Sequence, residues 1–171
     1  MAPAGTETRP TSDRLRETLF NVVANAVPGS VWLDLFAGTG AIGIEALSRG
    51  ASMAYFVESS KRAARTIREN LETLGIDEGY EVFERESATA LRLLDAEAIA
   101  FDFCFLDPPY RKMGDYEQTL DFLSRSRLLK PSSLVIAEHD KHFDPGEVFG
   151  QLRRRRTLRQ GDAVLSFYSK D

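Results

Sequence analysis

The residues best suited to chemistry form a turn, Asp107-Pro108-Pro109-Tyr110, directly after the mostly apolar run Phe101–Leu106. An apolar run bounded by turn residues is typical of a central strand buried on both faces. The two prolines fix the backbone and remove two N–H donors, so neither a strand nor a helix can continue through them. The turn would present a carboxylate, backbone carbonyls and an aromatic ring at a strand's carboxyl end, where open α/β sheets bind ligands. A plain surface turn has the same signature, so the rest of the chain has to decide.

A glycine loop, Gly38-Thr39-Gly40-Ala41-Ile42-Gly43, follows a second apolar run at 31–36 and precedes a helical pattern. It fits the G-x-G-x-x-G motif, and Glu58 stands about 20 residues further on, at the end of the next predicted strand. The glycines let a ligand approach the backbone, and Glu58 can accept hydrogen bonds from two ribose hydroxyls. The pattern alone fits a nicotinamide dinucleotide, another nucleoside cofactor or a purely structural turn.

Asp34, in the strand before this loop, favours S-adenosylmethionine over a dinucleotide. A carboxylate there would repel a pyrophosphate but could receive the amino group of a methionine moiety. The proline turn agrees, because Asp107 and the carbonyl of Pro108 can accept the N–H groups of an exocyclic base amine. Tyr110 offers a face on which a flipped base can stack. Methyl transfer to that amine would depend on orientation and electrostatics and would need no metal.

Composition limits the remaining possibilities. The 171 residues are 43% hydrophobic and 28% charged, with a formal net charge of -4. This length predicts one domain over residues 1–171, with a disordered end at 1–8. The one cysteine, Cys104, is expected to be buried and inert, and His139 and His142 to be ordinary surface or strand-end histidines rather than metal ligands. No apolar run reaches about 18 residues and no signal pattern is present, which predicts a cytoplasmic protein without a membrane partner.

Strand and helix patterns alternate through most of the chain. Strands are predicted at 31–36, 53–57, 80–84, 101–106, 134–138, 151–158 and 163–169, and helices near 11–26, 41–49, 60–74, 88–97 and 116–127. The alternation predicts a Rossmann-like α/β fold with a doubly wound, mostly parallel seven-stranded sheet and an antiparallel C-terminal hairpin.

The segments DLFAGTG and LDPPY resemble the class I methyltransferases that use S-adenosylmethionine to modify exocyclic amines of nucleobases. The segments RPTSDRLRETLFN, DLFAGTGAIGIEALSRGA and GDAVLSFY make the similarity narrower. Together they resemble the bacterial enzymes that methylate the guanine 2-amino group in 16S ribosomal RNA, from Arg9 to the C-terminus. The resemblance implies S-adenosylmethionine as cofactor, S-adenosylhomocysteine (SAH) as product, and 16S ribosomal RNA or the small ribosomal subunit as partner. Nothing in the sequence suggests a dimer interface, so a monomer is expected.

The resemblance also implies roles for individual residues. The cofactor would be held by Asp34, Phe36, Ala37, Gly38, Gly40, Glu58, Ser59, Ser87, Ala88 and Asp107. The catalytic residues that hold the target base would be Asp107, Pro108 and Tyr110, with substrate contacts from Pro109, Tyr110, Arg111, Lys112 and Arg9. Ser87 stands where such enzymes often carry Asp or Asn, so the adenine contact could come from backbone N–H groups instead.

Two features bear on RNA binding. Family members usually carry a basic β-hairpin before the RPT segment, and only eight residues precede Arg9 here, so weakened RNA capture is expected. Arg111-Lys112 and the run at 153–156 are the candidate basic surfaces, although protection of an edge strand explains the run equally well. One alternative is an amino methyltransferase that acts on another nucleic acid, for example at adenine-N6 in DNA or RNA. The others are an NAD-dependent oxidoreductase and a cofactor-binding protein without catalysis.

Overall fold

The computed structural model describes residues 10–109 and 113–171. The predictions for Arg9, Tyr110, Arg111 and Lys112, and that of a disordered end at 1–8, fall outside these residues. The helices are α1 (Pro10–Val23), the short 3-10 helix η1 (Ala24–Ala26), α2 (Ala41–Ser48), α3 (Lys61–Thr73), α4 (Ser87–Ala96) and α5 (Gly114–Arg125). The strands are β1 (Val31–Leu35), β2 (Met53–Val57), β3 (Tyr80–Phe83), β4 (Phe101–Leu106), β5 (Leu129–Asp140), β6 (Val148–Phe149), β7 (Leu152–Gln160) and β8 (Ala163–Lys170).

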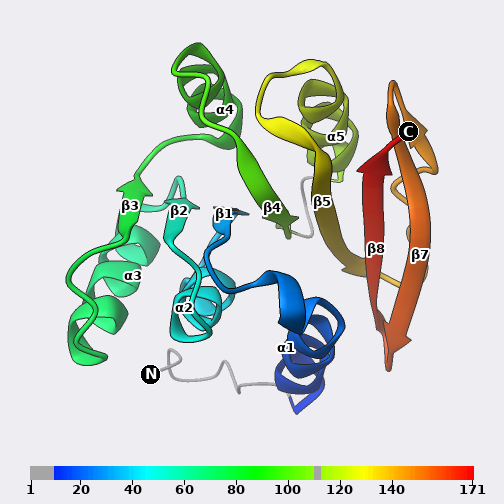
Figure 1. Cartoon of the computed structure of the whole chain (residues 1–171). Coiled ribbons are helices and arrows are strands. Elements are labelled where there is room, and N and C mark those ends of the chain that lie inside the picture. The colour runs from blue at the N-terminus through cyan, green and yellow to red at the C-terminus, as the bar shows by residue number, and fades with distance from the viewer. Residues whose placement is uncertain (1–9, 110–112) are drawn as a thin grey trace.

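The described strands form one sheet in the order β3-β2-β1-β4-β5-β8-β7-β6. Strands β1 to β5 pair in parallel, whereas β8 and β7 are antiparallel to their neighbours. Helices α1, α2 and α3 cover one face of the sheet, and α4 and α5 cover the other (Figure 1). The predicted doubly wound α/β fold is therefore confirmed. The count of seven strands omitted β6, a two-residue strand that pairs with the start of β7.

The order in which strands are added to the sheet changes direction between β1 and β4. Strands β2 and β3 follow on one side of β1, while β4 and β5 lie on the other. Open α/β sheets bind ligands at such a switch point, outside the carboxyl ends of the strands. Leu35 of β1 pairs with Leu106 of β4, so the glycine loop and the Asp107 turn leave the sheet side by side. The topology thus joins two motifs that are far apart in the sequence.

Strand β5 begins at Leu129 rather than at residue 134, so Pro131 lies inside a strand that was expected to start after it. The pairing register with β4 shifts within this stretch. Ser133 holds the irregular segment, because its hydroxyl donates to the carbonyl of Phe101 at 2.6 Å and accepts from the backbone N–H of Lys130 at 2.7 Å. Such a bulge depends on contacts with the neighbouring strand, which local sequence patterns do not contain.

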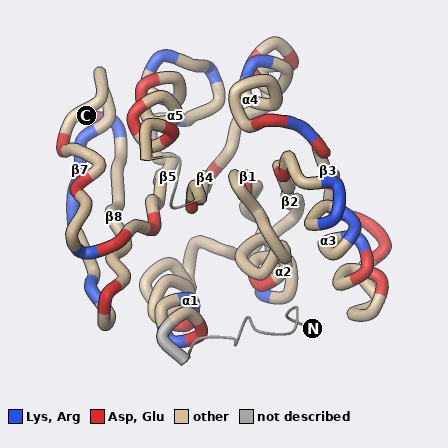
Figure 2. The backbone as a smooth tube through the Cα atoms, turned by 180° about the vertical axis from the view of Figure 1, so that it is seen from behind, with Lys and Arg blue, Asp and Glu red and all other residues tan. Residues whose placement is uncertain are grey.

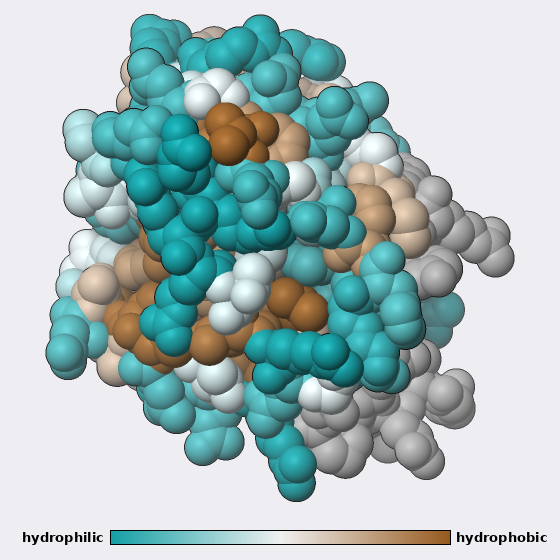
Figure 3. Space-filling model, turned by 90° about the vertical axis from the view of Figure 1, so that its right-hand side faces the viewer, coloured by the Kyte–Doolittle hydropathy of each residue, from teal (hydrophilic) through white to brown (hydrophobic). Residues whose placement is uncertain are grey.

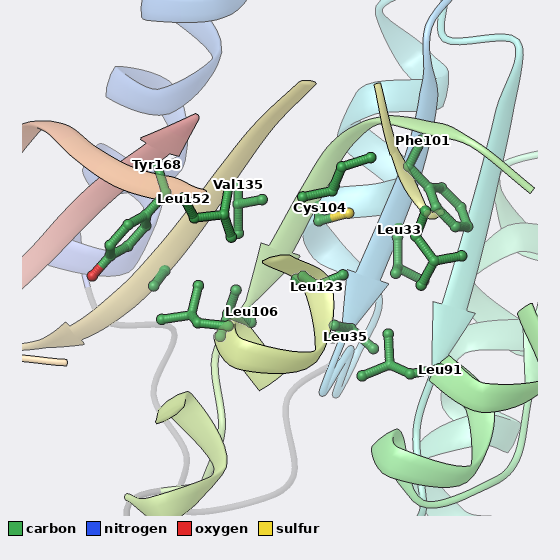
Figure 4. Close-up of a cluster of buried hydrophobic side chains, with 14 of the residues drawn as sticks. Leu33, Leu35, Leu91, Phe101, Cys104, Leu106, Leu123, Val135, Leu152 and Tyr168 are labelled. Carbon is green, nitrogen blue, oxygen red and sulfur yellow. The ribbon is translucent and has the colours of Figure 1, made fainter. Parts of the chain in front are cut away.

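Each face of the sheet has its own hydrophobic core. The core beneath α4 and α5 surrounds β4 and contains Cys104, which is buried as predicted (Figure 4). Burial raises the pKa of the Cys104 thiol far above its ordinary value, so it stays protonated. On the opposite face Trp32 stacks between Phe20 and Phe103, with ring centroids 5.3 and 4.4 Å away. Among the helices that the structure describes, none combines the length and apolar character needed to cross a membrane.

The arginine run lies on β7, along which basic residues are prominent (Figure 2). Arg153 and Arg155 both reach Asp171, at 3.3 and 3.0 Å, and Arg154 pairs with Asp144 at 2.6 Å. The side of the molecule that carries this hairpin is largely hydrophilic, with hydrophobic patches between the polar side chains (Figure 3). Because these three arginines have acidic partners within the molecule, the interpretation of the run as an RNA contact is weakened.

Gly43, the last glycine of the loop motif, lies where α2 packs against β2. A Cβ atom there would overlap with Cε1 of Phe56, whose ring is fully buried. Gly43→Ala is therefore expected to lower the free energy of unfolding by about 1–3 kcal/mol, because the ring or the helix must shift. Urea unfolding measures this loss. The control is Gly114→Ala, where no atom lies within 4 Å of the added Cβ; equal stability of the two variants would contradict the packing role.

Candidate active site at the carboxyl edge of the sheet

The loop after β1 contains residues in the left-handed backbone region. Gly38 and Gly40 have φ angles of 57° and 81°, which glycine adopts without strain. Phe36 has a φ of 59°, which is uncommon for a bulky residue and occurs where a binding site stores backbone strain. The Glu58 carboxylate ties this loop to the next, because it accepts the backbone N–H of Gly38 at 2.9 Å and that of Ser60 at 2.8 Å. The acid predicted to bind ribose thus also orders the glycine loop.

A cavity of about 280 Å³ opens between these loops and the Asp107 turn. We call it the glycine-loop cavity; it is lined by Phe36, Gly38, Val57, Glu58, Ser59, Arg85, Glu86, Ser87, Asp107 and Pro109. Most of the predicted cofactor contacts are in this lining. Asp34, Ala37, Gly40 and Ala88 are not, and Ala88 instead lines a neighbouring cavity between α4 and α5.

Asp34 lies near the end of β1 and is only 2% exposed. Its Oδ2 accepts the backbone N–H of Gly43, in α2, at 3.1 Å. Burial raises the pKa of Asp34 to about 8; the hydrogen bond from Gly43 offsets part of this rise, and the nearby Glu58 carboxylate adds to it. A bound cation would stabilise the ionised form of such a carboxyl. Asp34 is therefore suited to an ammonium group, which is the role predicted for it.

A second cavity, of about 450 Å³, lies on the other side of the Asp107 turn. We call it the hairpin cavity, because residues of the turn between β7 and β8 form one wall. Its lining is Ser12, Asp107, Pro108, Tyr116, Glu138, His139, Asp140, Gly161, Asp162 and Ala163. Asp107 borders both cavities, whereas Pro108 lines the hairpin cavity and Pro109 the glycine-loop cavity. The two prolines of the turn thus line different cavities.

Glu138, near the carboxyl end of β5, is a candidate that the sequence analysis missed. Burial, then the carboxylates of Glu138 and Asp34, raise the pKa of Asp107 well above its usual range. Burial likewise raises the pKa of Glu138. Asp107 is nevertheless open to solvent at the cavity mouth, so water screens part of the repulsion between the carboxylates. The available signal was an acid at the end of a predicted apolar strand, as for Glu58, but without the glycine motif that singled out Glu58.

The chemistry of the glycine-loop cavity fits S-adenosylmethionine better than a dinucleotide. Its lining has three acids, Glu58, Glu86 and Asp107, against one basic residue, Arg85, and the buried Asp34 lies just behind. Acidic walls attract a ligand with sulfonium and ammonium cations and repel a pyrophosphate. Within residues 10–109 and 113–171, no group of three or more His, Cys, Asp and Glu side chains is placed to hold a metal ion.

Comparison with known proteins identifies the family. The model of the family described as "Conserved hypothetical protein 95" matches residues 1–169. The chain belongs to this family. It is 35% identical to YlbH of Bacillus subtilis over 169 residues, which cover 99% of this chain and 91% of that protein. It is 40% identical to ribosomal RNA small subunit methyltransferase D of Haemophilus influenzae, over 78% of this chain and 68% of that protein.

Solved structures agree with this membership. The structure of yhhF from Escherichia coli has a TM-score of 0.83 and 28% identity, and covers 100% of this chain and 90% of its own. SMU.776, solved in complex with SAH, has a TM-score of 0.73 over 90% of this chain and 49% of its own. At 15% identity the latter shows the fold alone. The predicted family and methyltransferase fold are confirmed.

Glu58→Ala is expected to weaken SAH binding by about 10-fold or more, because hydrogen bonds to a charged acceptor contribute roughly 1.5–3 kcal/mol. The variant also releases the backbone N–H of Gly38 from its acceptor, so the loop should lose order together with affinity. Isothermal titration calorimetry measures the change. Glu84→Ala removes an exposed carboxylate that pairs with Arg68 outside the cavity lining, and is the matched control. Unchanged SAH affinity in Glu58→Ala would exclude the ribose role.

Proposed function

We propose that this chain transfers a methyl group from S-adenosylmethionine to the exocyclic 2-amino group of a guanine in 16S ribosomal RNA. The observation that carries this proposal is the position of Asp107, which borders both the glycine-loop cavity and the hairpin cavity. A carboxylate there can hold an acceptor amine where a methyl donor and a base meet. The small-subunit methyltransferase among the relatives supports the RNA substrate, and the sequence resemblance supports the guanine amine.

The Asp107 turn would act on the acceptor amine. That nitrogen is a weak nucleophile because its lone pair is delocalised into the base. Asp107 and the main-chain carbonyl of Pro108 would accept its N–H groups and leave the lone pair directed at the glycine-loop cavity. S-adenosylmethionine, when bound, supplies an electrophilic methyl group. The contribution of these residues is therefore orientation and electrostatic stabilisation.

Asp107 also suits the final proton transfer. Methylation of a neutral amine leaves a positive charge on the nitrogen until a proton is released. A carboxyl group with a raised pKa is a better proton acceptor than an ordinary aspartate, and the surroundings of Asp107 raise its pKa. Arg9, Tyr110, Arg111 and Lys112 remain proposed contacts to the RNA around the flipped base.

Transfer of labelled methyl from S-adenosylmethionine tests this function. The acceptors are small ribosomal subunits that lack the modification, naked 16S ribosomal RNA and duplex DNA, followed by nucleoside analysis. We expect N2-methylguanosine from the subunits or the RNA. N6-methyladenosine, or transfer to DNA alone, would overturn the assignment in favour of another amino methyltransferase. A protein that binds NAD tightly and SAH not at all would instead be an oxidoreductase.

A further inference from the structure

Glu138 lies beside Asp107 at the edge of the sheet. In the parallel pairing of β4 and β5, Phe105 is opposite Ile136 and Leu106 is opposite Ala137. Continued by one residue, this register places Asp107 opposite Glu138. Side chains alternate between faces along a strand, so the carboxylate of Glu138 belongs to the face of Ile136, which is the face of α1, α2 and α3. Asp107 follows β4 directly, and its pKa is raised by burial and by the neighbouring Glu138 carboxylate. Both carboxylates line the hairpin cavity.

The end of β5 that carries Glu138 is held by neighbouring side chains. The Tyr116 hydroxyl, from α5, donates to the main-chain carbonyl of Glu138. The next residue, His139, is 7% exposed, and its Nε2 lies 2.7 Å from the hydroxyl of Ser166 on β8. Contacts from two elements thus hold the main-chain carbonyl of Glu138 and the side chain of the residue that follows it. A carboxylate on a backbone held in this way can accept hydrogen bonds from one edge of a bound base with defined geometry.

The two carboxylates offer neighbouring acceptors to one edge of a base. Guanine presents two neighbouring donors on that edge, the 2-amino group and the N1–H, whereas adenine has a bare acceptor at N1. Hydrogen bonds donated by the N1–H and the amine stabilise the ionised forms of the two acids, and an ionised carboxylate accepts hydrogen bonds and donates none. A guanine can therefore donate a hydrogen bond to each of the two acids at once. A base without a proton at N1 would instead place the lone pair of N1 against the carboxylate of Glu138.

We propose that Glu138 is a specificity-determining residue, which accepts the N1–H of guanine while Asp107 accepts an N–H of the 2-amino group. This inference rests on the proposed methylation of a guanine amine. It assigns selection between bases to the fifth strand, separately from the turn that acts on the amine. Glu138 is half-buried in the free protein, and a base bound in the hairpin cavity would cover it further. Because an acceptor that is covered but left without its donor is costly, a site of this kind strongly rejects an analogue that lacks the donor.

The test compares guanosine with 2-aminopurine riboside at the methylated position of the 16S ribosomal RNA. 2-Aminopurine keeps the 2-amino group but has an unprotonated N1. For the wild-type protein we expect kcat/KM to be at least about 10²-fold lower on 2-aminopurine. Loss of O6 also contributes to this difference, so a variant is needed to isolate the part due to N1.

Glu138→Gln provides that comparison, because its amide can donate a hydrogen bond to the unprotonated N1. The variant should lose about 10-fold or more in kcat/KM on guanosine, and its preference for guanosine over 2-aminopurine should shrink by about 10-fold or more. Loss of O6 affects both proteins alike and cancels in this ratio. SAH affinity should not change. Glu81→Gln, which removes an exposed carboxylate on β3, should behave as wild type.

The outcomes separate this inference from the proposed function. If the wild-type protein forms no N2-methylguanosine on guanosine-containing RNA, the proposed function fails. If it forms N2-methylguanosine but uses 2-aminopurine equally well, the proposed function stands and the role of Glu138 is overturned. The role is overturned likewise if Glu138→Gln keeps the wild-type ratio between the two bases.

Discussion

Asp107→Ala is expected to lower the turnover of methyl transfer by about 10²-fold or more while leaving SAH affinity nearly unchanged. The reason is its position at the border of the two cavities, where its carboxylate would contact the proposed acceptor amine rather than the bulk of the cofactor. Loss of one orienting or electrostatic group in a catalytic site acts on this scale. Single-turnover transfer with excess protein separates this effect from product release.

Asp107→Asn refines this prediction. Its amide oxygen still accepts one hydrogen bond, but it cannot take up a proton and lacks the negative charge. Its rate should lie between those of the wild type and Asp107→Ala. Equal losses of turnover and SAH affinity in both variants would show that Asp107 supports the cofactor site and does not act on the amine.

Asp34→Asn is expected to stabilise the protein at alkaline pH and to weaken the cofactor. Folding raises the pKa of Asp34 from 3.8 to about 8, so the native state binds a proton that the unfolded chain releases. Stability must then fall as the pH rises through this window. An asparagine stays neutral and avoids the loss, so the variant should gain on the order of 2–5 kcal/mol over the wild type at pH 9 and little at pH 4.

The same substitution removes the anionic partner proposed for the methionine ammonium group. SAH affinity should therefore fall by about 10-fold or more, as for other hydrogen bonds to charged groups. Urea unfolding at pH 4, 6 and 9, together with calorimetric titration of SAH, measures both effects. A stabilised variant with wild-type affinity would remove Asp34 from the cofactor site, and a pH-independent difference in stability would contradict its buried, protonated state.

Much of the fold was predictable because its elements carry strong local signals. The apolar run of β4 ends at Asp107 in two prolines, and β1 ends in a glycine loop, so both boundaries follow from backbone chemistry. The early start of β5 was not predictable. Pro131 disfavours a strand, and the side chain of Ser133, through its bond to Phe101, is what holds the segment beside β4. That contact exists only once the sheet has formed.

Part of the candidate site was likewise predictable from local sequence signals, and part was not. Glu58 and Asp107 directly follow apolar strands, and Asp34 lies inside one just before the glycine loop, so the sequence predicted all three at one edge of the sheet. Glu138 ends the predicted strand 134–138 too, but only the register between β4 and β5 shows that it lies beside Asp107. The hairpin cavity was also beyond sequence reasoning, because its walls come from α1, α5 and the turn between β7 and β8.

The most direct test is a structure of the protein with SAH and an RNA that contains the target guanosine. The account predicts SAH in the glycine-loop cavity, the guanine in the hairpin cavity, and its 2-amino nitrogen about 3 Å from a carboxylate oxygen of Asp107. It also predicts that the lone pair of this nitrogen is directed at the sulfur. A guanine whose 2-amino group points away from Asp107, or SAH bound in the hairpin cavity, would contradict the account.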